Sequence, residues 1–192
     1  MKPWRSRRSG NRPVTTGQFQ ITPATDADYD VLLTMNGAAV PAVNLIDRAV
    51  LERLHGQAEV MLVARAGATQ APVGFLLALN RDADYSSPNF LYFRGRYARF
   101  AYVDRVVVDA AWRGHGIGVR LYEALIARSA SLDRITCEVN LEPPNPRSLA
   151  FHSRLGFVQV GEQDTEGGAK RVALLALELA TAPLPDRDGH SL

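Results

Sequence analysis

A glycine-rich segment in the second half of the chain could bind a phosphate group. It reads Arg-Gly-His-Gly-Ile-Gly over residues 113–118 and follows the β-branched run Val106–Val108, ahead of an apolar helical pattern. Glycines let the backbone approach a phosphate closely, and the free amides and macrodipole of a helix N-terminus favour negative charge. We therefore predict that a phosphorylated ligand lies on residues 114–118.

Two common nucleotide-binding motifs do not fit this segment. A dinucleotide-binding fold requires a third glycine at the end of the GxGxxG pattern, and Val119 stands there. A P-loop requires Lys followed by Ser or Thr after its last glycine, whereas Gly118 is followed by Val119 and Arg120. Both alternatives therefore fail on spacing.

A second motif lies downstream and makes the interpretation of the glycine-rich segment more specific. It begins at Asn145 and continues through Ser148 and His152 to Gly156-Phe157. Together with the Arg-x-x-Gly-x-Gly pattern, it resembles the two signatures of the GNAT acetyltransferase family. The spacing agrees at every step, but His152 stands where the family most often has tyrosine. The resemblance covers about residues 17–180 and is strongest over 102–157.

The resemblance implies an acetyl-coenzyme A-dependent N-acetyltransferase that acts on a primary amine of a small molecule, an amino acid derivative or a protein. It also implies that the fourth and fifth strands splay apart at the cofactor. The expected cofactor-binding residues are Val106, Val107, Val108, Arg113, Gly114, His115, Gly116, Ile117, Gly118 and Asn145. The alternative, from another functional class, is a non-catalytic module that binds or senses acyl-coenzyme A.

Two residues are candidates for catalysis. By resemblance, His152 approaches the coenzyme A sulfur and donates a proton to the departing thiolate; the alternative is a core histidine bonded to a backbone carbonyl. Asp104 is the candidate base, with an ion pair to Arg105 as the alternative. If no bulge interrupts the strand, Asp104 shares one face with Tyr102, Val106 and Val108.

The amine acceptor is expected against two regions. Residues 85–102 carry seven of the fifteen aromatic residues of the chain with arginines between them, and they form either a lid or a small core that pins a long loop. The segment Asn36–Asn44 after the first helix is the second expected wall. The expected acceptor-binding residues are Asn36, Tyr85, Tyr92 and Tyr102.

Composition bounds the class of protein. The chain has 192 residues, of which 46% are hydrophobic and 22% charged, and these proportions predict one globular domain over residues 17–180. Apolar runs are too short to cross a bilayer and no secretory signal is recognisable, so we expect no membrane partner and a cytoplasmic location. The lone cysteine, Cys137, agrees with a reducing compartment.

Further partners are limited by the charge pattern. Five of the basic residues fall in the first 18 positions, where Pro and Gly are also frequent, so residues 1–16 are predicted to be a disordered tail and not a nucleic-acid site. Residues 181–192 are predicted to be a second flexible tail. No cluster has metal-ligand spacing, and a homodimer is left open.

Hydrophobic periodicity predicts the elements that must position these residues. Strands are expected near 19–21, 59–66, 72–79, 100–108, 135–139, 158 and 172–179, and helices over 25–37, 47–55, 116–130 and 146–155. A hairpin-rich first half and an alternating second half indicate a single-domain α/β (α+β) fold with a mixed, mostly antiparallel central sheet flanked by helices.

Overall fold

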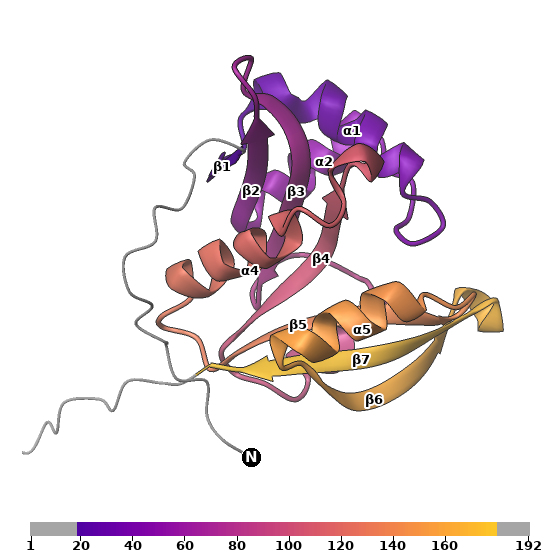
Figure 1. The fold of residues 1–192 in the computed structure, drawn as a ribbon. Helices are drawn as coiled ribbons and strands as arrows, with labels where there is room; N and C mark the ends of the chain where they lie inside the picture. The colour runs from indigo at the N-terminus through magenta and orange to yellow at the C-terminus, as the bar shows by residue number, and fades with distance from the viewer. Residues whose placement is uncertain (1–18, 180–192) are drawn as a thin grey trace, which may run out of the picture.

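The computed structural model describes residues 19–179, so the two tails predicted for 1–16 and 181–192 lie outside it. Seven strands form one sheet in the order β1-β2-β3-β4-β5-β7-β6, and only β4 and β5 pair in parallel (Figure 1). The strands are β1 Phe19–Pro23, β2 Ala58–Ala66, β3 Ala71–Asn80, β4 Phe100–Val108, β5 Arg134–Glu142, β6 Val158–Thr165 and β7 Lys170–Glu178. This confirms the predicted mixed, mostly antiparallel sheet.

Five α-helices cover the two faces of the sheet. The helices are α1 Tyr29–Ala38, α2 Arg48–Gly56, α3 Pro88–Arg94, α4 Ile117–Arg128 and α5 Pro146–Leu155. Residues of α1, α2 and α3 share one apolar core, and those of α4 and α5 share another on the opposite face, where Figure 1 shows them lying across the strands. Side chains of a strand alternate between these two cores.

Pairing between the two central strands stops halfway. The parallel ladder joins β4 and β5 only from Phe100↔Arg134 to Val103↔Cys137, although both strands continue for several residues. Beyond that point the strands diverge, and Figure 1 shows β4 and β5 leading away from each other. The expected splay is confirmed, and it opens a gap in the middle of the sheet.

A β-bulge at Asp104 changes the facing of the second half of β4. Leu77 of β3 pairs with Arg105, whereas the next residue of β3, Ala78, pairs with Val103, so Asp104 has no partner. Consequently Asp104 and Arg105 both lie on the face covered by α1–α3. The expectation that Val106 and Val108 share a face with Asp104 is therefore wrong, because these two residues pack in the core on the opposite face.

The aromatic segment 85–102 was expected to be a long connection, yet it contains the helix α3. Phe90 and Phe93 of this helix and Phe100 of β4 are fully buried, and their rings contact one another. Proline at the first helical position and apolar residues on one side explain the short helix. The small core, one of the two alternatives, describes this segment.

Helix ends follow local rules that the sequence contains. Asp47 accepts a hydrogen bond from Val50 N at the start of α2, and Gly156 ends α5 in the left-handed conformation with φ of 95°. Asp28 accepts hydrogen bonds from the backbone amide and the hydroxyl of Thr25, and the two residues form a capping box. The first helix nevertheless begins with a 3-10 turn, and α1 proper starts at Tyr29.

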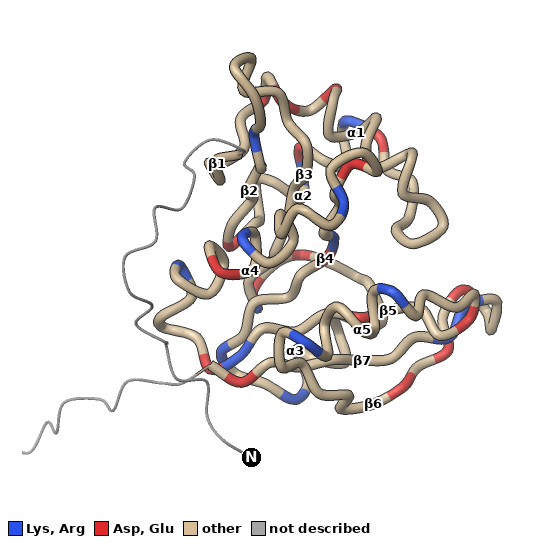
Figure 2. Tube along the Cα trace, viewed as in Figure 1, with Lys and Arg blue, Asp and Glu red and all other residues tan. Residues whose placement is uncertain are grey.

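Acidic and basic residues are interspersed over the described surface, as Figure 2 shows for the end of β6 and β7. Within residues 19–179, no helix combines the length and apolar character needed to cross a membrane.

Close packing of α3 against β6 makes Gly161 sensitive to substitution. The Tyr92 hydroxyl donates to Val160 O at 2.8 Å, and a Cβ on Gly161 would overlap that hydroxyl. We expect Gly161→Ala to lower the free energy of unfolding by about 1–3 kcal/mol in chemical denaturation. Gly56→Ala, at a site with open space, is the matched control and should change it by less than about 1 kcal/mol. Equal effects of the two variants would contradict the packing argument.

Candidate active site

A groove of about 630 Å³ runs along the open end of the splay. The glycine-rich segment and the start of α4 form one wall, and α5 with the residues before it forms another. The loop after α1 closes the groove through Ala39, Pro41 and Ala42, and β5 contributes Asn140. Of the expected cofactor-binding residues, the groove is lined by Val106, Val107, Val108, Arg113, Gly114, Gly116, Ile117, Gly118 and Asn145.

Backbone conformation explains two of the glycines. Gly114 and Gly116 have φ of 85° and 81°, in the left-handed region that side chains rarely adopt. Gly116 is the N-cap of the 12-residue helix α4, so the amides of the first helical turn are not used within the helix and lie beside the groove. This terminus is therefore able to hold an anionic group.

Gly118 has a different role from its two neighbours. A Cβ at this position would lie 3.0 Å from the ring of Phe151, so glycine permits the close contact between α4 and α5. His115 does not line the groove, and its ring lies 5.7 Å from that of Trp112. The structure therefore gives His115 no direct part in the groove wall.

Asn145 both caps α5 and lies in the groove wall. Its side-chain oxygen accepts a hydrogen bond from Ser148 N at 3.1 Å and caps α5, and the residue also lines the groove. Because the oxygen is used by the cap, the amide nitrogen is the part of this side chain that remains for a ligand.

His152 lies in the core beneath the groove. It is 3% exposed, its Nδ1 lies 2.8 Å from Ser148 O, and its Nε2 lies 2.8 Å from the Tyr122 hydroxyl. Since a carbonyl only accepts, Nδ1 carries the proton and Tyr122 donates to Nε2. Burial lowers the pKa of His152, which favours the neutral form. This geometry favours the core histidine over the proton donor.

Asp104 and Arg105 form a buried ion pair, the second alternative for this position. The Arg105 Nε donates to the Asp104 carboxylate at 2.6 Å, and the side chains are 4% and 3% exposed. The other carboxylate oxygen accepts from the Tyr85 hydroxyl at 2.6 Å. Both carboxylate oxygens are engaged by donors of the protein, so this geometry favours the ion pair over the base.

A carboxyl group that sequence reasoning missed lies nearby, at Glu138 of β5. It accepts a hydrogen bond from the buried Tyr102 hydroxyl at 2.6 Å. Burial raises the pKa of Glu138 to about 7; hydrogen bonds from Tyr102 and Asn89 oppose this rise, and the charge of Asp104 adds to it. The ionisation of Glu138 therefore falls near neutral pH.

A signal for Glu138 exists in the sequence. Ile135, Cys137 and Val139 pack in the core under α4 and α5, so alternation places Glu138 on the opposite face, beside the acceptor region. An acidic residue flanked by the buried Cys137 and Val139, in the strand next to the central one, is unusual. Its importance depends on Tyr102 and Asp104 of another strand, which periodicity does not reveal.

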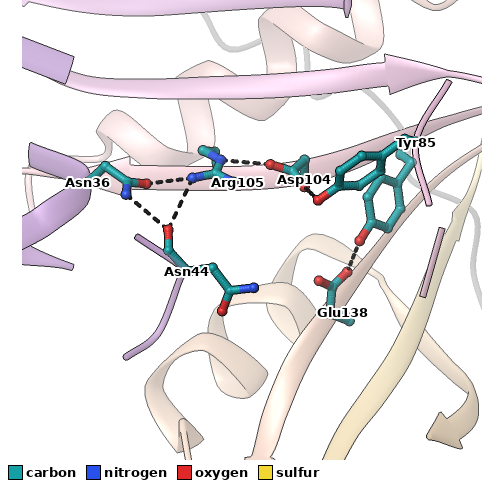
Figure 3. A network of polar contacts seen from close by, with 7 residues as sticks. Asn36, Asn44, Tyr85, Asp104, Arg105 and Glu138 are labelled. Atoms are coloured by element: carbon teal, nitrogen blue, oxygen red, sulfur yellow. Dashed lines mark hydrogen bonds and ion pairs between the residues drawn. The ribbon is translucent and has the colours of Figure 1, made fainter. Parts of the chain in front are cut away.

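All four expected acceptor-binding residues have polar partners within the protein, three of them in the network of Figure 3. Asn36 is fully buried and accepts from Arg105, while Tyr85 and Tyr102 donate to Asp104 and Glu138 respectively. Tyr92 binds β6 instead and lies outside this network. The structure thus brings Asn36, Tyr85 and Tyr102 to one polar network without leaving their polar groups free.

Among residues 19–179, no group of three or more His, Cys, Asp or Glu side chains could hold a metal ion.

Comparison with solved structures shows the same fold. Ard1 from Thermoplasma volcanium is 16% identical with a TM-score of 0.68, covering 85% of this chain and 99% of that one. The ribosomal-protein-S18-alanine N-acetyltransferase from Escherichia coli is 15% identical with a TM-score of 0.63, covering 85% and 96%. The putative acetyltransferase yncA from Salmonella typhimurium, solved with its cofactor acetyl-CoA, is 19% identical with a TM-score of 0.65, covering 89% and 99%.

The sequence itself matches a family model. A comparison with curated proteins found no match. Residues 33–157, however, match the model of the "Acetyltransferase (GNAT) family", a span that includes the glycine-rich segment, Glu138 and α5. The chain therefore belongs to the GNAT acetyltransferase family.

Proposed function

We propose that this GNAT enzyme transfers the acetyl group of acetyl-coenzyme A to a primary amine, with Glu138 as the general base. The observation that carries the proposal is the pairing of two features at the splay. The groove with the glycine-rich segment opens at the gap between β4 and β5. The Glu138 carboxyl lies on the face of β5 opposite α4 and α5. Anion binding and proton removal are thus available at one gap.

The residues present fit acetyl-coenzyme A, which the family uses. We assign the diphosphate to the backbone amides of residues 114–119 at the N-terminus of α4, with Arg113 at the same wall. The groove of about 630 Å³ accommodates an extended ligand arm between α4 and α5. When bound, this co-substrate supplies a thioester whose acetyl group is activated for attack by an amine.

Backbone amides of β4 can stabilise the developing oxyanion. Asp109 N donates to Val73 O of β3, and amides alternate in direction along a strand. The amides of Val106 and Val108 are therefore directed toward the gap where β5 is no longer paired, whereas that of Val107 faces β3. Val106 and Val108 are accordingly the proposed oxyanion donors, and Val107 is not.

Glu138 suits the role of base because its pKa of about 7 leaves a large share ionised at neutral pH while keeping it basic. Its carboxylate would accept a proton from the attacking amine. On the groove side, the thioester C–S bond would break and coenzyme A would leave as a thiolate, to which the Ser148 hydroxyl in the groove wall would donate. The Ser148 Oγ lies 3.3 Å from His152 Nδ1. We assign His152 the role of holding this first turn of α5.

The acceptor is proposed to be a small-molecule or peptide amine. The structural neighbour from Escherichia coli is a ribosomal-protein-S18-alanine N-acetyltransferase, which is compatible with a peptide amine as the acceptor here. Neither a membrane nor nucleic acid is part of the proposal, and the cytoplasmic location stays a prediction.

Charge at the helix N-terminus gives a direct test of the cofactor site. We expect Gly116→Asp to weaken acetyl-coenzyme A binding by about 10- to 100-fold in calorimetric titration, because it places a carboxylate beside the bound phosphates. Gly116→Asn has the same shape, tolerates the left-handed conformation and carries no charge, so it should lose less than about tenfold. Equal losses of affinity in the two variants would contradict the assignment of the phosphates to this position.

Release of coenzyme A thiol in the presence of amines tests the proposed activity. We expect the wild-type protein to release thiol with at least one amine of a panel, and Glu138→Gln to lower kcat by about 10²- to 10⁴-fold with unchanged acetyl-coenzyme A affinity. Binding of acetyl-coenzyme A without thiol release by the wild type would instead support the non-catalytic acyl-coenzyme A module.

The charge of Asp104 should be visible in the pH dependence of the reaction. For an acceptor amine whose own pKa lies well above 9, the plot of kcat/KM against pH should contain a rising limb near pH 7, where Glu138 loses its proton. Because Asp104 raises the pKa of Glu138, Asp104→Asn should move this limb to lower pH by about one unit. Tyr85→Phe keeps the charge and is the control. A limb that stays in place in Asp104→Asn would contradict the coupling.

A further inference from the structure

The loop between α1 and α2, residues 39–47, spans the gap in the sheet and is attached on both sides of it. Toward β4, Arg105 Nη1 donates to Asn44 O at 3.3 Å. Toward β5 and β7, Asn140 Nδ2 donates to Pro41 O at 3.3 Å and Lys170 Nζ donates to Asn44 Oδ1 at 2.7 Å. We call this loop the strap, and its attachments hold it across the acceptor side of the splay.

Arg105 gives the β4 attachment its rigidity. The same Nη1 donates to Asn36 Oδ1 at 2.7 Å, and Asn36 Nδ2 donates to Asn44 O at 3.0 Å, so the carbonyl of Asn44 receives two donors (Figure 3). Asn36 is fully buried and Arg105 is tied to Asp104. The backbone of Asn44 is thereby fixed relative to the central strand.

Lys170 fixes the side chain of the same residue. A lysine ammonium only donates, so the atom of Asn44 that faces it must be the oxygen, and the amide nitrogen must point the other way. Figure 3 shows this nitrogen directed to the side on which Glu138 lies. No hydrogen-bond partner for Asn44 Nδ2 is found within the described part of the chain, and the residue is exposed.

We propose that Asn44 is a specificity-determining residue whose Nδ2 donates to an oxygen atom that the acceptor carries next to its amino group. The inference rests on the proposed function, since the amine is placed at Glu138. An acceptor of this class is an amine with a carbonyl on the adjoining carbon, as in an amino acid amide or the N-terminus of a peptide. Lys170 is already paired with Glu166, so the subsite favours a neutral oxygen.

A pair of matched ligands separates hydrogen bonding from shape. Two conjugates join coenzyme A through a thioether to the acetylated form of glycinamide or of isobutylamine, two amines with the same branched arrangement of heavy atoms. Their affinities are measured by calorimetry, which needs no turnover. We expect the wild type to bind the glycinamide conjugate about tenfold more tightly, the size of one hydrogen bond with its desolvation.

Asn44→Asp is the discriminating variant. A carboxylate keeps the attachment to Lys170 and the backbone bonds but removes the donor, so the preference should fall below about threefold. Leu45→Ala, at an exposed side chain of the same strap, is the control and should keep the full preference. Thermal unfolding of each variant confirms that the fold is retained.

The outcomes are distinct. A wild type that binds both conjugates equally, or an Asn44→Asp variant that keeps the preference, would overturn the role of Asn44 and leave the proposed transferase intact. A folded protein that binds neither the conjugates nor coenzyme A would overturn the proposed function, and this inference with it.

Discussion

The loss of pairing between β4 and β5 after Val103 and Cys137 is the constraint on which the rest of the structure depends. Parallel strands that stay paired leave no space for a ligand within the sheet, and strands that part expose backbone amides and carbonyls that must find other partners. Here the groove, the proposed oxyanion amides and the proposed general base all lie along the unpaired stretch. Groups from distant parts of the chain therefore meet at one gap.

Each side of the gap is closed by a different kind of interaction. On the groove side, α4 and α5 pack closely because Gly118 has no side chain between its backbone and Phe151. On the acceptor side, the strap is held by hydrogen bonds to Arg105, Asn140 and Lys170. Apolar packing therefore forms the first wall, whereas hydrogen bonds hold the second in place.

Burial separates the roles of the two acids near the gap. Asp104 has a guanidinium beside it, and breaking a buried pair of this kind costs about 3–5 kcal/mol, so it serves the structure. Glu138 has hydroxyl and amide donors but no cation, and its pKa rises to about 7. The bulge in β4 matters here because it turns Asp104 and Arg105 to the same face, where the charge of Asp104 also acts on Glu138.

Local features were determined by the sequence alone. The strand, the glycine-rich turn and the two helix starts at Gly116 and Asn145 follow from residue types within a few positions of each other, so β4, the turn and the starts of α4 and α5 could be predicted from them. The tertiary structure decided the non-local part. It placed His152 in the core against Tyr122, folded part of the aromatic segment into α3, and raised the pKa of Glu138 through burial and the charge of Asp104. The physical reason is that burial and charge act through space between strands, while backbone conformation and capping are set by neighbours along the chain.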